Sequence, residues 1–502
     1  MLDGIIERGL TPTVPTDYDR WKPLHWCLAV PDVMAQGGFD AIIGNPPFLG
    51  GQKLTGAMGT NVRDWFVNEV ADGRRGSADL VAYFFLRAVS LIDAGGTLGL
   101  IATNTVAQGD TREVGLDHMV ANGFTLMRAI QSRPWPAASA NLEYAAVWGT
   151  AGATPDNSKR VVDDEVVTKI STLLEAEGRV EGLPVRLREN AGVAYKGGFV
   201  LGMGFVVSLE DASAWMERDP RNSEVLRPYL NGEDLYGRPR SDAHRWVIDF
   251  GVMDQERASS YTEPFERVQE AVLPVRRKDK MRSRRERWWV HGDRAPELRS
   301  ACEGLESVLA LVVVSRNIMP MRISSDQLIT NAMTVFATES YDLQGLLSSS
   351  MHNLWAVKYS SGLRADPRYS PTDVFETFPR PRSTDPVAAV GESLDVERRE
   401  IMLRRALGLT KLYNLVNDPD IADASDPDVA RMREIHVELD EAVMAAYGWD
   451  DVPLHHGFHT YRQMTRWTVS PEARVEILDR LLEENHRRAA LQDGPPAEEE
   501  TG

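Results

Sequence analysis

Cysteine is scarce in this chain, which contains only Cys27 and Cys302 among 502 residues. The two lie far apart and have no companions, so the sequence indicates neither a disulfide framework nor a cysteine zinc site. Long apolar runs are absent too. The longest run, 308–314, falls far short of the about 20 residues that span a bilayer, and the N-terminus carries no signal-peptide pattern. We therefore predict a cytoplasmic protein without a membrane partner.

Basic residues are in the minority, because 56 Lys and Arg stand against 74 Asp and Glu and leave a net charge of −18. This balance argues against general affinity for phosphate. Residues 276–287 depart from it, with eight basic side chains followed directly by Trp288 and Trp289. Such a cluster is typical of a nucleic-acid contact, although a solvated helix face with tryptophans packed in the core has the same pattern. The candidate contacts are Arg276, Arg277, Lys278, Lys280, Arg282, Arg284, Arg285 and Arg287.

The composition is otherwise that of a globular protein, with 43% hydrophobic and 26% charged residues. The length allows two or three domains. From Phe39 to about Thr150, apolar strands alternate with segments of helical spacing, which predicts an α/β fold built on a parallel, doubly wound sheet. A polar connector at 151–159 follows, then short strands and turns to about residue 382, and finally a helical region.

The most informative motif is Asn45-Pro46-Pro47-Phe48, which directly follows the apolar strand 39–44. An amine conjugated to a purine ring is a poor nucleophile because its lone pair is delocalised, so a catalyst must hold both N–H bonds. The side-chain oxygen of Asn45 and the backbone carbonyl of Pro46 can accept them, and the ring of Phe48 can stack on a flipped base. The motif suits methyl transfer to an exocyclic amine. Asn-Pro-Pro is also a common way to end a strand and begin a loop.

Polar residues also follow the next predicted strand, 97–102, where Thr103 and Asn104 stand. In doubly wound sheets, ligands bind beyond the carboxyl ends of the strands. We therefore expect Thr103 and Asn104, together with Asp40, to contact a cofactor or the target. A role for Asn104 as a turn former fits the sequence equally well.

These motifs resemble those of the gamma-type DNA adenine-N6 methyltransferases, in particular the large type IIG and IIL-like enzymes of restriction-modification and phage defence. The resemblance rests on FDAIIGNPPF (39–48), SADLVAYFF (77–85), GGTLGLIATN (95–104) and YSPTDVFETFP (369–379), and it extends from about residue 18 to residue 485. It implies a Rossmann-like methyltransferase sheet, S-adenosylmethionine as methyl donor, double-stranded DNA as partner and direct transfer without a metal. It also implies a second aromatic residue against the flipped base, for which Trp135 and Tyr144 are the candidates.

One departure from the family pattern concerns the cofactor. Family members carry a glycine-rich cofactor motif and a ribose-binding acidic residue well upstream of the Asn-Pro-Pro-Phe turn. Only 44 residues precede Asn45 here, and they contain no strand, glycine loop and helix in succession. The chain therefore resembles the second half of such an enzyme, with the first half missing, truncated or encoded as a separate N-terminal methyltransferase subunit.

We accordingly predict four regions: the C-terminal part of a methyltransferase catalytic domain (1–150), a mixed α/β target-recognition domain (151–382), a helical region (383–490) and a disordered tail (491–502). Two other functions remain open. Without its cofactor half, the chain would be a non-catalytic DNA-binding specificity subunit or a remnant. Related Asn-Pro-Pro-aromatic turns also serve protein glutamine N5 methyltransferases, but a small protein substrate would not require the long region after residue 150.

Overall fold

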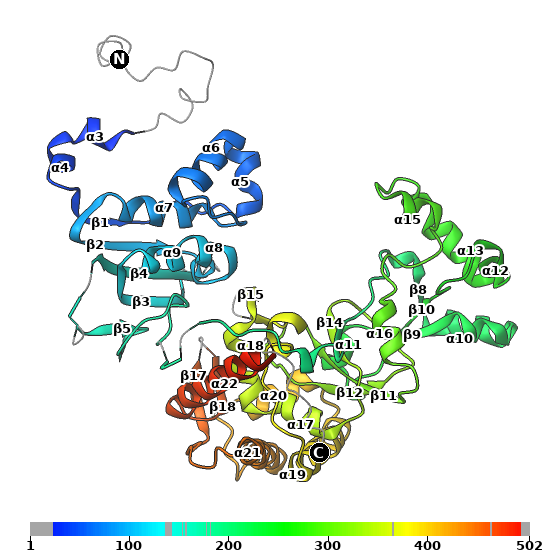
Figure 1. The fold of residues 1–502 in the computed structure, drawn as a ribbon. Helices are drawn as coiled ribbons and strands as arrows, with labels where there is room; N and C mark the ends of the chain where they lie inside the picture. Colours follow the sequence, from blue (N-terminus) through cyan, green and yellow to red (C-terminus); the bar gives the residue numbers. More distant parts are fainter. Residues whose placement is uncertain are drawn as a thin grey trace, which may run out of the picture. The chain divides into compact units, whose positions relative to one another are not determined.

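The computed structural model divides into two compact units, residues 1–177 and 178–502. It describes residues 24–135, 143–152, 154–155, 158–176, 178–180, 182–363, 366–461 and 464–492. Figure 1 shows the elements of both with their labels.

A six-stranded sheet with the order β1-β2-β4-β3-β5-β6 forms the first unit. Its strands are β1 (Phe39–Gly44), β2 (Ile92–Ala102), β3 (Phe124–Pro134), β4 (Glu143–Ala151), β5 (Arg160–Val162) and β6 (Glu165–Val167). Strand β1 pairs with β2 in parallel, and β4 runs antiparallel between β2 and β3. Strands β1, β2 and β3 therefore point the same way, and their carboxyl ends share one edge of the sheet.

Three helices, α7 (Leu80–Val89), α8 (Gly109–Val114) and α9 (Leu116–Ala121), pack on one face of this sheet (Figure 1). The other helical segments of the unit are α3 (Trp26–Ala29), α4 (Pro31–Ala35), α5 (Gly51–Met58), α6 (Thr60–Trp65), η1 (Phe66–Val70) and η2 (Asn104–Ala107). On the opposite face Ala41 and Thr97 are exposed, and Ile43 is 83% exposed. Among the described strands β1 pairs only with β2, so one edge of β1 is open.

The second unit begins with two four-stranded sheets. The sheet β13-β9-β10-β8 belongs to a lobe at about residues 199–294, which has its own apolar core around Phe205, Val247 and Trp289. Its strands are β8 (Val206–Ser208), β9 (Leu226–Leu230), β10 (Arg245–Ile248) and β13 (Leu328–Ile329). The helical segments of this part are η3 (Arg188–Asn190), η4 (Met203–Phe205), α10 (Leu209–Arg218), η5 (Pro220–Glu224), α11 (Gly232–Gly237), α12 (Gln255–Ser259), α13 (Thr262–Ala271), α14 (Leu273–Arg276), α15 (Arg282–Glu286) and α16 (Pro296–Ala301).

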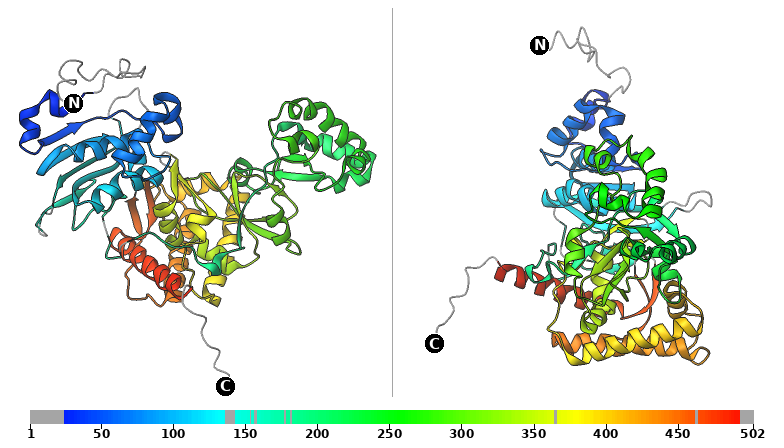
Figure 2. Two further views of the ribbon diagram at one scale, coloured as in Figure 1. Left: turned by 45° about the horizontal axis from the view of Figure 1, so that its top comes forward. Right: turned by 90° about the vertical axis from the view of Figure 1, so that its right-hand side faces the viewer.

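The other sheet, β12-β11-β14-β7, shares a single core with the C-terminal helices. Its strands are β7 (Ala194–Lys196), β11 (Ser307–Val312), β12 (Met321–Ser324) and β14 (Met333–Phe336). Two separate hairpins are formed by β15 (Ser361–Leu363) with β16 (Asp366–Arg368) and by β17 (Gly457–Tyr461) with β18 (Met464–Thr468). The helices are α17 (Tyr341–Ser348), α18 (Ser350–Tyr359), η6 (Pro371–Phe375), α19 (Asp385–Arg404), α20 (Leu409–Val416), α21 (Pro427–Tyr447) and α22 (Pro471–Gln492). Figure 2 shows the long helices α19 and α21 side by side.

The predicted fold class is confirmed: an α/β sheet precedes a mixed α/β region and C-terminal helices. The boundaries differ in two places. Strands β5 and β6 extend the first sheet beyond residue 150, so the first unit ends at 177. The helical region also contains the β17–β18 hairpin and shares its core with the preceding sheet. Of the predicted tail, only Leu491 and Gln492 lie within the described residues, and they end α22.

Candidate functional site

The Asn45-Pro46-Pro47-Phe48 turn begins where β1 ends, at the carboxyl edge of the first sheet. Pro46 is buried, whereas Asn45 and Pro47 are exposed and the ring of Phe48 is 37% exposed. The Asn45 side chain forms no hydrogen bond with any other described residue. Its amide is therefore not engaged in holding the turn together. Pro46 anchors the backbone, and the amide and the phenyl ring on either side of it remain accessible.

The segment after this turn is held in place by Asp79, the N-cap of α7. Its Oδ1 accepts hydrogen bonds from the Leu49 backbone N–H at 3.1 Å and from the Val81 backbone N–H at 3.0 Å. The Asp79 backbone N–H in turn donates to Thr111 Oγ1 at 3.0 Å. Gly51 is needed at the same place, because a Cβ there would lie 2.2 Å from the Ser77 carbonyl oxygen. The loop is thus tied to α7 and α8.

Sequence reasoning assigned no role to Asp79. An aspartate immediately before an apolar helical run is a recognised N-cap signal, and it would have located the start of α7. The same carboxylate also accepts a hydrogen bond from the Leu49 backbone, 30 residues away. This second contact depends on how β1 and α7 pack together.

The same edge of the sheet carries four other predicted residues. Thr103 and Asn104 follow β2, the neighbour of β1. Thr103 Oγ1 lies 2.6 Å from Thr105 Oγ1, and Asn104 Nδ2 lies 3.5 Å from Glu143 Oε2 at the start of β4. Tyr144, the next residue of β4, meets Trp135 edge to face with ring centroids 5.5 Å apart.

Because β4 is antiparallel to both β2 and β3, it begins at the edge of the sheet where those two strands end. This edge, which also carries Asn45, therefore holds Thr103, Asn104, Tyr144 and Trp135. Neighbouring strands lie about 4.8 Å apart, so β4 stands about 10 Å from β1 and β3 about 14 Å. Tyr144 is consequently nearer to the Asn45 turn than Trp135 is, and the edge-to-face contact makes the two aromatic rings one assembly.

Asp40 is not brought to this edge. It is the second residue of β1, five positions before Asn45, and an extended strand rises about 3.3 Å per residue. Its carboxylate therefore lies about 16 Å from the turn, near the opposite edge of the sheet. The expectation that Asp40 joins Thr103 and Asn104 at a ligand is corrected accordingly.

The basic segment 276–287 is only partly available for contacts. Arg276 is 2% exposed, and its guanidinium donates to the backbone carbonyl of Leu201 at 3.2 Å and to those of Val200 and Val290 at 3.5 Å. Burial lowers the pKa of this guanidinium. Arg276 therefore braces the lobe, and it is removed from the set of candidate DNA contacts.

The aromatic part of this pattern is also structural, since Trp288 and Trp289 are each 7% exposed in the core of the lobe. The other basic residues reach solvent. Two of them have acidic partners within the segment, because Arg282 pairs with Glu286 at 2.6 Å and Arg284 with Asp279 at 3.7 Å.

Among the described residues, no helix has the length and apolar character required to cross a bilayer. No group of three or more His, Cys, Asp and Glu side chains in the described part of the chain is arranged to hold a metal ion.

Two family models match the chain. Residues 10–128 match the Eco57I restriction-modification methylase, and residues 198–382 match the MmeI target recognition domain. No curated protein matches.

Among solved structures, the type IIL restriction-modification enzyme MmeI in complex with DNA superposes with a TM-score of 0.67 at 17% identity. That match covers 93% of this chain and 59% of the MmeI chain, so this chain spans 59% of the length of that relative. The likeness shows a shared fold.

Two more distant structures also match. A putative class I S-adenosylmethionine-dependent methyltransferase from Listeria monocytogenes gives a TM-score of 0.20 at 11% identity, over 25% of this chain and 36% of the other. The type IIG restriction endonuclease BpuSI gives 0.28 at 13%, over 82% and 54%. The family resemblance predicted from the motifs is confirmed for the two segments that the family models match, the restriction-modification methylase segment and the target recognition domain.

Proposed function

We propose that the chain is the catalytic and target-recognition part of a site-specific DNA methyltransferase, which transfers a methyl group from S-adenosylmethionine to the N6 amine of an adenine flipped out of the duplex. The observation that carries this proposal is the Asn45 turn. It lies at the carboxyl edge of the sheet, its amide makes no hydrogen bond within the described residues, and the Phe48 ring is partly exposed.

The proposed roles follow from the donors and acceptors of the turn. The two N–H groups of the target amine donate hydrogen bonds, one to Asn45 Oδ1 and one to the Pro46 carbonyl oxygen. These bonds counter the delocalisation of the nitrogen lone pair into the ring. Pro46 and Pro47 fix the backbone so that these acceptors stay in place. Phe48 stacks on one face of the base, and Tyr144 with Trp135 is the candidate for the other face. Catalysis is then mainly positioning of the amine for direct transfer.

S-adenosylmethionine supplies an electrophilic methyl group when it is bound. Among the described residues, Thr103 and Asn104 would contact it from one side; the loop that enters α5 at Gly50 and Gly51 follows the Asn45 turn itself and is not a second, upstream strand–loop–helix unit. The chain by itself therefore does not fit the whole cofactor. In open α/β sheets, ligands bind where the strand order reverses. All other strands of the first sheet lie on one side of β1, so a further strand on its open edge would create such a point beside Asn45.

We accordingly infer that a cofactor-binding half completes the sheet at β1, either in the same polypeptide or as a separate chain. Strands of parallel sheets are normally covered on both faces, and the 83% exposure of Ile43 marks a face that such a half would cover. Methylation then takes place in the cytoplasm, on double-stranded DNA.

The test is a methylation assay with radiolabelled S-adenosylmethionine and plasmid DNA, using the chain alone and together with the polypeptide encoded immediately upstream of it. We expect N6-methyladenine by mass spectrometry of the digested product. Asn45→Ala should lower the rate by about 100-fold or more, as loss of a critical hydrogen-bonding group does elsewhere. Asn122→Ala is the matched control, because Asn122 is an exposed asparagine that precedes β3 at the opposite edge of the sheet.

Three results would contradict this proposal in different ways. DNA binding without methylation in either setting would favour the specificity subunit. N4-methylcytosine would retain the amine chemistry and exclude adenine as the target. Methylation of a glutamine-containing protein, with DNA left unmodified, would favour the glutamine N5 methyltransferase.

A further inference from the structure

The lobe of the second unit ends in a compact basic projection, here called the basic tip: α14, the turn 277–281, α15 and Arg287. Between residues 276 and 287 the chain has eight basic and two acidic side chains, within a protein whose net charge is −18. The contacts made inside the tip decide which of these charges face outward.

Both acidic residues are used inside the tip. Asp279 Oδ1 accepts a hydrogen bond from the Met281 backbone N–H at 2.8 Å, and Asp279 Oδ2 lies 3.7 Å from the Arg284 guanidinium. Glu286 pairs with Arg282 at 2.6 Å. The carboxylates thus shape the turn and offset two arginines, and the remaining cations have no acidic partner within the tip.

Four of these cations also lack a hydrogen-bond partner among the described residues. Arg277, Lys278, Lys280 and Arg287 are exposed, and their side chains form no hydrogen bond or ion pair among the residues that the structure describes. Lys278 and Lys280 flank the turn that Asp279 stabilises, so their Cα positions are held while their ammonium groups remain solvated.

The base of the tip is anchored. Arg276 Nη2 donates to the Leu201 carbonyl at 3.2 Å, and the Arg276 guanidinium lies 5.9 Å from the centroid of the Phe205 ring in the lobe core. Arg285 Nη1 donates to the backbone carbonyls of Asp279 at 2.8 Å and Lys280 at 3.0 Å. Three of the four unpaired cations, Arg277, Lys278 and Lys280, therefore lie on a turn that is already organised, which reduces the entropy lost on binding.

We propose that the basic tip binds the phosphate backbone of duplex DNA and supplies a sequence-independent, salt-dependent part of the affinity. This inference rests on the DNA-binding part of the proposed function, because the lobe lies within the residues that match a target recognition domain. A polyanion is the complementary partner for a concentrated positive patch on an acidic protein.

Two features favour backbone contact over base reading. Helices α14 and α15 have only four and five residues, too short to lie along a major groove as a recognition helix does. Lysine ammonium groups on flexible stems act on phosphate as point charges.

The experiment measures binding of the purified full chain to fluorescently labelled duplexes of about 30 base pairs and unrelated sequence, at several KCl concentrations. The test variant is Lys278→Ala/Lys280→Ala. The matched control is Arg240→Ala/Lys411→Ala, which removes two exposed, unpaired cations from the same unit outside the tip. A charge-preserving variant, Lys278→Arg/Lys280→Arg, separates loss of charge from loss of fold.

Each neutralised phosphate contributes about 0.9 to the slope of log K against log[salt]. We expect the test variant to reduce the steepness of this slope by about 2 and to weaken binding to every duplex by a similar factor. The control and the charge-preserving variant should keep the wild-type slope.

One outcome is that the wild type binds DNA and the test variant shows the same slope of log K against log[salt] as the wild type. The tip then does not contact the DNA phosphate backbone and this inference is wrong, while the proposed function stands. A change in preference between duplexes at constant slope would mean that the tip reads bases, which also overturns the inference. If the wild type binds no duplex at low salt, the DNA-binding premise itself fails.

Discussion

At the scale of single residues, His352 is held neutral in the interior of the protein. His352 is fully buried, and its Nδ1–H donates to the Leu347 carbonyl at 3.0 Å while Nε2 accepts from the Tyr369 hydroxyl at 3.0 Å. Burial lowers the pKa of His352 to about 4. Both ring nitrogens are satisfied in the neutral form, and a second proton would displace the Tyr369 hydrogen bond.

This arrangement predicts a loss of stability in mild acid. Unfolded histidine titrates near pH 6.5, so between about pH 6.5 and pH 4 the unfolded state binds more protons at this site than the folded state does. The free energy of unfolding should therefore fall as the pH decreases, by about 2 kcal/mol at pH 5 relative to pH 7 for this one group. Urea unfolding at several pH values measures it.

His352→Gln provides the comparison, because glutamine does not titrate. Its own stability at pH 7 should be lower, but the part of the pH dependence that belongs to His352 should disappear. Parallel pH profiles for the variant and the wild type would contradict this assignment.

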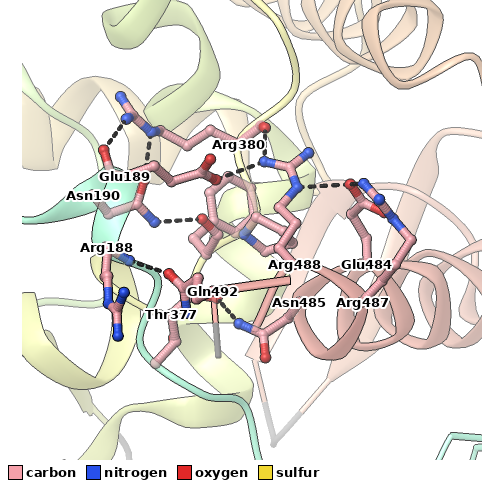
Figure 3. A network of polar contacts seen from close by, with 12 residues as sticks. Arg188, Glu189, Asn190, Thr377, Arg380, Glu484, Asn485, Arg487, Arg488 and Gln492 are labelled. Atoms are coloured by element: carbon pink, nitrogen blue, oxygen red, sulfur yellow. Dashed lines mark hydrogen bonds and ion pairs between the residues drawn. The ribbon is translucent and has the colours of Figure 1, made fainter. Parts of the chain in front are cut away.

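At the scale of elements, helix α22 links segments that stand far apart in the sequence. Figure 3 shows its side chains meeting Arg188 and Glu189, which lie shortly before the matched segment 198–382, and Thr377 and Arg380, which lie at the end of that segment. Asn485 is fully buried and forms three hydrogen bonds, to the Val185 N–H at 2.8 Å, the Val185 carbonyl at 2.7 Å and the Thr377 carbonyl at 2.6 Å. The helix thereby holds the entrance and the exit of the recognition region together.

Replacing Asn485 should therefore be costly. Asn485→Leu keeps a similar volume but leaves the buried Thr377 carbonyl and two part-buried Val185 backbone groups without these partners, and we expect a loss of about 2–4 kcal/mol in the free energy of unfolding. Arg487→Ala is the control, since Arg487 is exposed on the same helix and, among the described residues, pairs with Glu484 alone. It should change stability by less than about 1 kcal/mol. Equal losses in the two variants would contradict the linking role of Asn485.

At the scale of the whole molecule, the chain consists of two units with separate apolar cores. Cooperative unfolding requires a shared core, so each unit should unfold on its own. Within the second unit, the sheet β12-β11-β14-β7 and the C-terminal helices share one core and should unfold together, whereas the lobe at about residues 199–294 has a core of its own.

Calorimetry can test this division with two variants. Asp79→Ala removes the N-cap of α7 and the bond to Leu49, at a cost of about 1–2 kcal/mol, and should lower only the transition of the first unit. Asn485→Leu should lower only that of the second. A single transition shifted by both variants would contradict the division.

Local features of the sequence determined much of this protein. The residue before proline avoids helical conformations, so Asn45-Pro46-Pro47 had to follow the strand rather than continue into a helix. Alternating apolar patterns determined the α/β class. The motifs also identified the family, because the chemistry of an exocyclic amine places strict demands on a few adjacent residues. All of these depend on neighbours within a few positions along the chain.

Only the tertiary structure decided which residues are available. Arg276 is buried and its neighbours Arg277 and Lys278 are free, although all three belong to the same basic run. Strand pairing brought Tyr144 to the edge that carries Asn45 and kept Asp40 at the opposite end of β1. The open edge of β1 likewise depends on strand order. Burial and pairing are set by contacts between residues distant in sequence, which local patterns do not encode.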